Sequence, residues 1–173
     1  ISEGVLENPK VNGMFGQHVF PDLEVGQVGF KAGMYMASTD ELHITINGKG
    51  GHAALPEKNK NPIKVASKLI SDLYDYFDKE KETPSVFSIG FIEGNGSTNV
   101  VPNKVKMMGT LRAMDENWRE NAHDKMLNVA EELSKKYHVE IDFDILKGYP
   151  LLENDIPLTD KAIKLAKRYL GEE

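Results

Sequence analysis

The segment Val139-Glu140-Ile141-Asp142-Phe143-Asp144-Ile145 alternates apolar and acidic side chains at every step. Successive side chains of a β-strand point to opposite faces of its sheet. The alternation therefore predicts a strand with one face in a core and the other in water. The other elements can be placed outward from this strand.

Similar strands are predicted at residues 42–46, 87–91 and 105–113, and two helical patterns separate them. Asn61 and Pro62 suit an N-cap and a first helical position. The first helix carries Ile63, Ala66, Ile70, Leu73 and Phe77 at helical spacing, and the second carries Trp118, Ala122, Met126, Val129, Leu133 and Tyr137. The order β-α-β-β-α-β over residues 41–149 predicts an α+β, ferredoxin-like sandwich. Its four-stranded, mostly antiparallel sheet has two helices on one face.

The flanks of this region have a different composition. Residues 1–40 are glycine-rich with short apolar pieces, and residues 150–173 read as a proline-punctuated loop followed by a helix from Thr159. The chain opens with Ile1 and ends just past that helix. We therefore expect both ends to be cuts through a longer protein, with processed termini as the alternative.

Composition narrows the function classes. Lys and Arg total 21 and Asp and Glu total 27, so the net charge of −6 argues against nucleic acid and anionic membrane surfaces as partners. No apolar run approaches the ~18 residues of a membrane span. The absence of cysteine excludes disulfides and thiolate chemistry within this chain and fits a cytoplasmic protein.

Three motifs suggest chemistry. Gly48-Lys49-Gly50-Gly51-His52-Ala53-Ala54-Leu55-Pro56 places one histidine among small residues after a strand, and Asn99-Val100-Val101-Pro102 and Thr110-Leu111-Arg112-Ala113 follow it in order. Alone, His52 would be read as a turn histidine satisfied by backbone groups, Asn99 as a turn residue and Arg112 as an exposed sheet arginine. Together the motifs resemble the lid domain of the M20 family of zinc-dependent peptidases and amidohydrolases. Residues 17–26 are similar to the entry to that lid in the N-acyl-amino-acid amidohydrolase branch, of the aminoacylase or hippurate-hydrolase type.

The resemblance implies roles for four residues. His52 would stabilise the oxyanion as water adds to the scissile carbonyl, and in dimeric members it reaches the partner's active site. Asn99 would bind a substrate oxygen, and Arg112 would hold the α-carboxylate bidentately. His18 would be a metal ligand, its partner ligands lying outside this chain. Segments 1–40 and 150–173 would then belong to the catalytic domain.

The other three histidines are read as surface residues: His43 on the polar face of a strand, His123 on the exposed side of a helix, and His138 at a helix–strand joint. Two positions depart from the branch's pattern. Glu57 stands where many members have histidine, and Asn61 stands where aspartate often precedes the helix-starting proline. These departures affect the expected substrate preference rather than the lid assignment.

The resemblance predicts part of a metal-dependent hydrolase that cleaves the amide bond of N-acyl amino acids or small peptides. Two divalent ions, zinc first, with manganese or cobalt as alternatives, would activate a water, and the lid would form a homodimer. This chain alone would bind no metal firmly and would have no turnover, since a catalytic zinc site needs about three protein ligands. The alternatives are a non-catalytic dimerisation module and a small-ligand-binding domain of the same topology.

Overall fold

The computed structural model describes residues 3–80 and 83–171. Two compact units are present, residues 31–159 on the one hand and residues 1–30 with 160–173 on the other. The ends of the predicted flanks, residues 1, 2, 172 and 173, lie outside the described residues.

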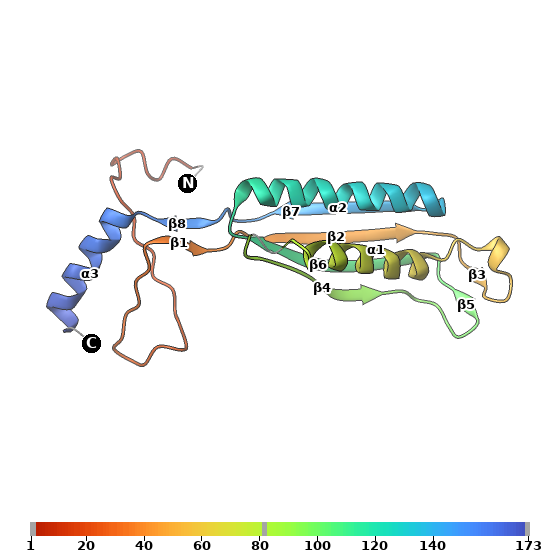
Figure 1. The fold of residues 1–173 in the computed structure, drawn as a ribbon, viewed down its shortest axis with the longest axis horizontal. Coiled ribbons are helices and arrows are strands. Elements are labelled where there is room, and N and C mark those ends of the chain that lie inside the picture. The colour runs from red at the N-terminus through yellow and green to blue at the C-terminus, as the bar shows by residue number, and fades with distance from the viewer. Residues whose placement is uncertain (1–2, 81–82, 172–173) are drawn as a thin grey trace. The chain divides into compact units, whose positions relative to one another are not determined.

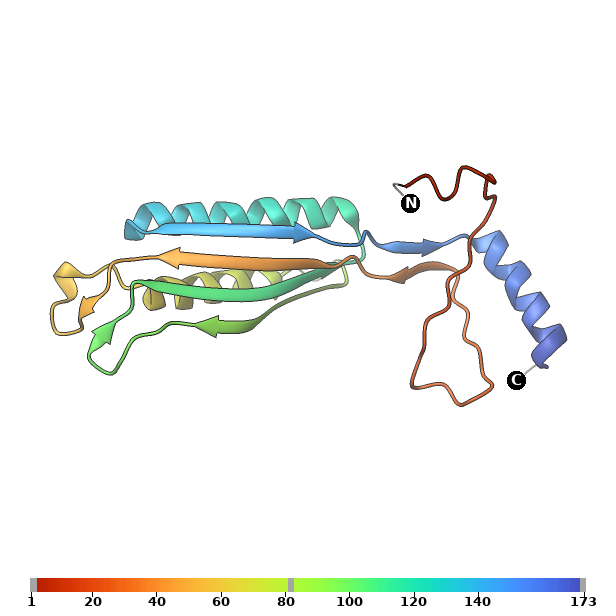
Figure 2. The same cartoon turned by 180° about the vertical axis from the view of Figure 1, so that it is seen from behind.

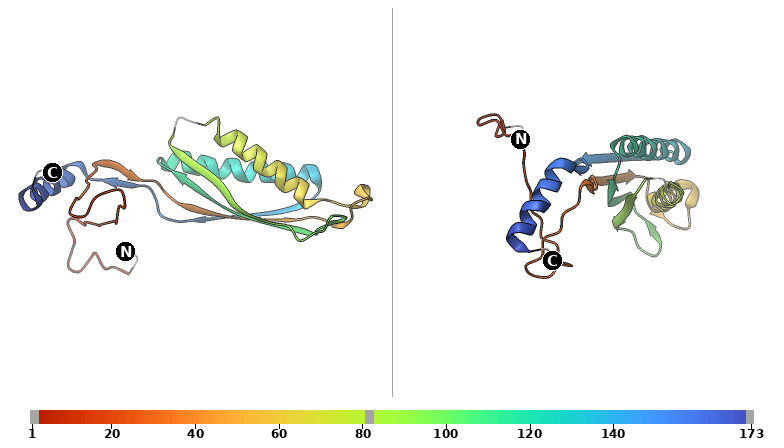
Figure 3. Two further views of the ribbon diagram at one scale, coloured as in Figure 1. Left: turned by 90° about the horizontal axis from the view of Figure 1, so that it is seen from below. Right: turned by 60° about the vertical axis from the view of Figure 1, so that its left-hand side comes forward.

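A four-stranded antiparallel sheet with the strand order β4-β6-β2-β7 is the centre of the unit 31–159 (Figure 1). Its strands are β2 (Asp40–Asn47), β4 (Ser85–Glu93), β6 (Lys104–Ala113) and β7 (Glu140–Lys147). The helices α1 (Pro62–Phe77) and α2 (Glu116–Tyr137) pack on one face (Figure 3), and the strands lie in front when the sheet is seen from behind (Figure 2). The predicted ferredoxin-like sandwich is therefore confirmed.

The core lies between the sheet and the two helices. Leu42, Ile44 and Ile46 of β2 are at most 1% exposed, and their alternating neighbours are on the open face. The rest of the core is Val65, Ala66, Leu69 and Leu73 of α1, Phe87, Val105, Met107 and Leu111 of the sheet, and Ala122, Met126, Val129, Ala130 and Leu133 of α2, with Val139. Burying one such aliphatic side chain contributes roughly 1.5–3 kcal/mol, so this interface dominates the stability of the unit.

Three details differ from the sequence prediction. On α1, Val65 and Leu69 are buried while Ile63 is exposed, because the core-facing stripe is rotated from the one predicted. In β4 the ladder shifts register between Ile89 and Phe91, which moves Phe91 to the open face. The last helix, α3 (Ile156–Leu170), begins three residues before Thr159, and Asp155 accepts a hydrogen bond from the N–H of Leu158.

Two small sheets extend the unit at opposite ends (Figure 1). At one end β1 (Gly33–Met36) pairs with β8 (Leu152–Asn154), and we call this pair the ribbon. At the other end β3 (Gly51–His52) pairs with β5 (Val100–Val101), beside the short 3-10 helix Pro56–Lys58. The sequence patterns predicted neither pair. None of the described helices is long and apolar enough to cross a membrane.

Candidate functional site

The glycine-rich segment before His52 is held close to neighbouring backbone. A Cβ on Gly48 would lie 2.2 Å from the carbonyl oxygen of Lys60, and one on Gly50 would lie 2.3 Å from that of Val101. Gly51 has φ +153°, and a Cβ there would meet the side chain of Asn59 at 2.4 Å. Only glycine allows this approach. The local sequence therefore fixes the path of the chain into His52.

The ring of His52 is exposed, and the backbone sets its tautomer. Its Nδ1 lies 3.1 Å from the backbone nitrogen of Ala54, which can only donate, so Nδ1 accepts. The ring proton of neutral His52 therefore lies on Nε2, which remains a hydrogen-bond donor. The side-chain amide of Asn59 donates to the His52 carbonyl at 2.8 Å and fixes the loop from the other side.

Asn99 belongs to the same end of the unit as His52. The N–H of Ala53 donates to the Asn99 carbonyl at 2.9 Å, and His52 faces Val100 in the β3–β5 ladder. The hydroxyl of Ser97 donates to the side-chain oxygen of Asn99 at 3.1 Å. The amide nitrogen of Asn99 thus remains a donor in an exposed turn beside His52. The structure brings these two predicted site residues together.

Arg112 lies far from that pair. It is exposed on the open face of the sheet, near the end of β6, where it faces Val86 of β4. β6 begins at Lys104, directly after β5, and eight residues of extended strand span about 26 Å. Within one chain, the structure therefore does not bring Arg112 together with His52 and Asn99.

His18 belongs to the other unit and is described alone. It is exposed, and its Nδ1 lies 2.6 Å from the carbonyl oxygen of Val19, which can only accept. Nδ1 therefore carries the proton, and Nε2 of neutral His18 presents a lone pair, as a metal ligand requires. Within the described residues no group of three His, Asp or Glu side chains is arranged to hold a metal ion.

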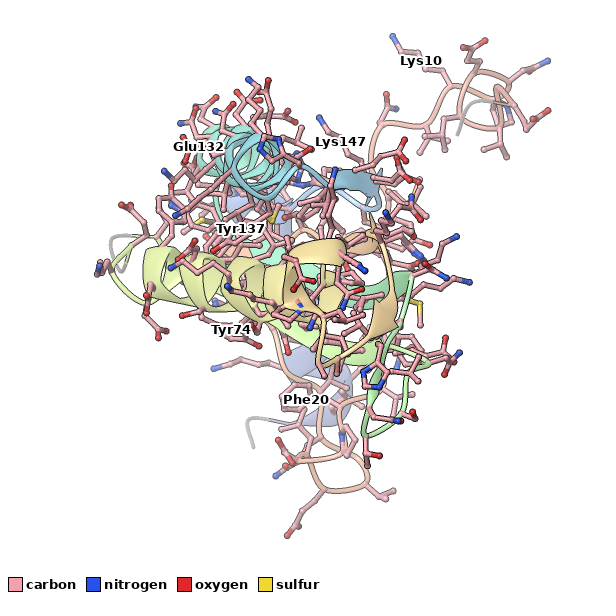
Figure 4. The ribbon with its side chains drawn as sticks, turned by 90° about the vertical axis from the view of Figure 1, so that its right-hand side faces the viewer. Lys10, Phe20, Tyr74, Glu132, Tyr137 and Lys147 are labelled. Carbon is pink, nitrogen blue, oxygen red and sulfur yellow. The ribbon has the colours of Figure 1, made fainter. Side chains whose placement is uncertain are left out.

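A shallow cavity of about 330 Å³ lies behind the His52 loop. Its walls include Ala53, Lys60 and Tyr137, and Figure 4 shows Tyr137 between the two helices at this end. Lys64 of α1 lies 5.8 Å from the Tyr137 ring centre. Neither His52 nor Asn99 lines this cavity, so their polar groups serve a different surface.

The family comparison decides what kind of domain this is. The M20 family's model for the peptidase dimerisation domain matches residues 39–138, which include His52, Asn99 and Arg112. The chain belongs to the M20 family. The predicted resemblance is confirmed at the level of family and fold.

Its similarity to known M20 proteins extends over almost the whole chain. The N-acetylcysteine deacetylase of Bacillus subtilis (strain 168) is 34% identical over 170 residues, which are 97% of this chain and 44% of that protein. Thermostable carboxypeptidase 2 of Saccharolobus solfataricus is 28% identical over 168 residues, 95% of this chain and 42% of that protein. The crystal structure of the Bacillus subtilis YXEP protein, a dinuclear metal-binding M20 peptidase, aligns with a TM-score of 0.69 and 32% identity, covering 97% of this chain and 43% of that one. The chain thus spans less than half the length of these relatives.

The M20 domain also contains a buried charge cluster that sequence reasoning missed. The interpretation of His123 as a surface residue was wrong: its side chain is 5% exposed, and its Nε2 lies 2.7 Å from Oδ2 of Asp40. Arg119 is buried too and donates to both oxygens of the same carboxylate. Burial alone would raise the pKa of Asp40, but the hydrogen bonds and charges of Arg119 and His123 outweigh burial and lower it.

A signal for this cluster exists in the sequence. Arg119 and His123 are spaced i and i+4 and stand beside Ala122 and Met126 of the apolar stripe of α2. Two basic residues on a core-facing stripe indicate a buried acidic partner. Which acid it is could not be predicted, because Asp40 lies 79 residues before Arg119 in the sequence.

Proposed function

We propose that this chain is the lid and dimerisation part of a metal-dependent hydrolase that cleaves the amide bond of N-acyl amino acids or small peptides. The observation that carries the proposal is the tautomer of His52, whose Nε2–H is an exposed donor on a backbone-fixed loop of an M20 domain. The N-acetylcysteine deacetylase among its relatives supports an N-acyl amino acid as the substrate class. A cytoplasmic location is part of the proposal.

In the reaction, His52 donates a hydrogen bond to the oxyanion. Addition of water to an amide carbonyl places negative charge on the oxygen, and a fixed N–H donor stabilises that charge more than it stabilises the neutral carbonyl. The hydrogen bond from Ala54 keeps the proton on the exposed nitrogen. The Asn99 amide, held beside His52, donates to a second substrate oxygen. Arg112 receives the α-carboxylate in its guanidinium fork.

The distance between Arg112 and His52 requires two chains to form one site. The two edge strands of the sheet differ in how well they suit pairing with a copy. The edge strand β7 carries exposed Glu140, Asp142 and Asp144, which would repel a copy of themselves, whereas β4 exposes Gly90, Phe91 and Ile92. We therefore place the dimer contact at β4.

A two-fold dimer through β4 joins the separated residues. Two copies of one strand related by a two-fold axis run antiparallel, so the Ser85 end of one β4 lies beside the Glu93 end of the other. Ser85 pairs with Ala113, next to Arg112, while Glu93 leads toward Asn99 and the β3–β5 pair. The Arg112 end of one chain therefore faces the partner's His52 and Asn99.

The metal centre must be completed from outside the described residues. His18 offers one imidazole nitrogen, and a catalytic site takes about three protein ligands. The residues present therefore fit one ligand position and no more. Two divalent ions, zinc first, are proposed for the whole protein, in keeping with the dinuclear YXEP relative. The ions would activate the attacking water.

The test is hydrolysis of N-acetyl amino acids by the full-length protein that carries this chain. His52→Ala should lower kcat by about 10²–10³-fold with little change in KM, as the loss of one oxyanion donor does. His52→Gln, which keeps an N–H donor, should retain more activity. His43→Ala, which changes a half-buried histidine on the open face of the four-stranded sheet, should match the wild type. An unchanged kcat in His52→Ala would refute the proposed role.

A further inference from the structure

The buried charge cluster lies where the sheet continues into the ribbon. Asp40 is the first residue of β2, and its side chain is 0% exposed. Arg119 donates from Nε to Oδ2 at 2.9 Å and from Nη2 to Oδ1 at 2.5 Å, while His123 completes the shell around Oδ2. Both basic residues come from the N-terminal half of α2, so the cluster ties that helix to the start of β2.

The same groups also hold the chain between β7 and β8. Oδ1 of Asp40 accepts a hydrogen bond from the N–H of Gly148 at 3.3 Å. Arg119 Nη1 donates to one oxygen of Glu116 at 2.8 Å, and the other oxygen accepts from the N–H of Leu151 at 2.7 Å. Arg119 thus fixes the carboxylates of Asp40 and Glu116, and each carboxylate accepts a hydrogen bond from the backbone of the segment that leads to the ribbon.

The two connections are also bonded to each other and to the sheet. Thr39 donates to the Tyr149 carbonyl at 3.0 Å and accepts from Gly148 at 2.9 Å. Ser38 exchanges backbone and side-chain hydrogen bonds with Ala113 at the end of β6. Gly148 is required here, because a Cβ would lie 2.5 Å from the Thr39 carbonyl oxygen. The connections from sheet to ribbon, residues 37–39 and 148–151, are therefore hydrogen-bonded to each other, to β6 and to the side chains of the cluster.

Stability alone does not explain such a cluster. Desolvating two charges costs several kcal/mol per ion, and well-packed apolar residues in their place are often as stable or more stable. His123 adds a further cost, because its Nδ1 is buried and has no hydrogen-bond partner among the described residues; the nearest carboxylate oxygen, of Glu120, is 3.9 Å away and is bound by Lys147. What the cluster supplies is a fixed direction for two backbone segments.

We propose that Asp40, Arg119 and His123 are positioning residues that lock the ribbon to the four-stranded sheet and thereby hold the sheet, with the His52 loop at its other end, in the orientation that the active site needs. The link from this orientation to catalysis rests on the proposed function. None of the three residues touches the substrate.

The test uses the full-length protein and a double variant, D40N/R119M, which removes both charges of the buried pair. Glu116 loses its contact with Arg119 but is partly exposed and keeps the hydrogen bond from Leu151. The matched control is E131Q/K135M, which removes an exposed ion pair from the same helix. Amide hydrogen exchange is followed in peptides covering residues 37–40 and 148–151, with residues 104–110 as the internal reference. Hydrolysis is measured with N-acetyl amino acids.

In D40N/R119M the two connecting peptides should exchange at least about tenfold faster while the reference peptide is unchanged, because only the lock has opened. kcat should fall by about ten- to a hundredfold with KM within about twofold, as expected when a catalytic group is misplaced by a remote change. The control should behave as the wild type. Unchanged exchange, equal acceleration throughout the sheet, or a kcat equal to that of the control would overturn the proposal.

Two provisions keep the outcome decisive. If the double variant does not fold, Arg119→Lys, which keeps the charge but loses the fork, goes through the same measurements with the same expected direction. If the wild-type protein hydrolyses no N-acyl amino acid, the proposed function fails, and the exchange rates of the two connecting peptides still decide whether the ribbon is locked.

Discussion

Two inactive variants of the full-length protein should recover activity when they are mixed. The variants are His52→Ala and Arg112→Ala, each prepared as a homodimer. Arg112 lies eight residues along β6 from Lys104, about 26 Å of strand from the end that carries His52. An N-acyl amino acid cannot span that distance, so the proposed site takes Arg112 from one chain and His52 from the other.

The size of the recovery follows from subunit statistics. Free exchange between equal amounts of the two variants makes about half of the dimers mixed. One of the two sites in a mixed dimer then contains both native residues, and the other contains neither. The mixture should therefore reach about a quarter of the wild-type rate, and each variant alone should stay near its background.

A third variant provides the matched control for this experiment. Asn99 and His52 are joined by the hydrogen bond from Ala53, so both reach a site from the same chain. A mixture of His52→Ala with Asn99→Ala has no intact site in any dimer and should show no recovery. The assay is initial rate after subunit exchange, with the dimer fraction checked by light scattering. Recovery in the control mixture, or none with Arg112→Ala in confirmed mixed dimers, would refute the shared site.

Three further changes test other parts of the structure. Asp40→Asn in the isolated unit 31–159 should lower the free energy of unfolding at pH 7 by about 3–5 kcal/mol, because it leaves the charge of Arg119 buried and unpaired. The ion pair lowers the pKa of Asp40, so its contribution is present above the ordinary value near ~3.9 and is lost as pH falls through the lowered one. Urea unfolding followed by the single tryptophan should therefore show the gap to wild type shrinking in acid, and a gap independent of pH would contradict this. Gly50→Ala should reduce kcat strongly and the free energy of unfolding only slightly, because the added Cβ would displace β3 from the carbonyl of Val101. A kcat equal to that of the wild type would count against the rigid loop. Phe91→Lys should convert the dimer to a monomer in sedimentation, and a dimer that persists would exclude the β4 contact.

Much of the fold was predictable because its signal is local. The alternation at 139–145 and the stripe of α2 need only neighbouring residues to be seen, and both became the elements expected. The misplaced details depend on long-range packing. The register shift beside Gly90 depends on the pairing with β6, and the buried stripe of α1 depends on which side chains of β2 and β6 it meets.

The features of the candidate site also separate into those with a local sequence signal, which could be predicted, and those that depend on long-range contacts, which could not. The neighbours of His52 indicated a tight turn, and glycine does make the close backbone contacts there. Nothing in the sequence indicated that Asn99 would be hydrogen-bonded beside His52 while Arg112 would lie at the far end of its strand. His123 was misplaced for a related reason: a charged residue is assigned to the surface unless its partner is known, and its partner Asp40 is 83 residues away.

His18 and His52 differ in whether Nε2 carries a lone pair or a proton, and the backbone atom that contacts Nδ1 determines this difference. At His18 a carbonyl takes the Nδ1 proton, which leaves a lone pair on Nε2 suited to a cation. At His52 an amide N–H fills the Nδ1 lone pair, which leaves a proton on Nε2 suited to an anion. A hydrolase that polarises a carbonyl needs one group of each kind, a metal ligand and an oxyanion donor. The identity of the atom that contacts Nδ1, rather than the presence of a histidine, therefore suits each residue to its proposed role, and exchanging the two histidine environments should abolish both.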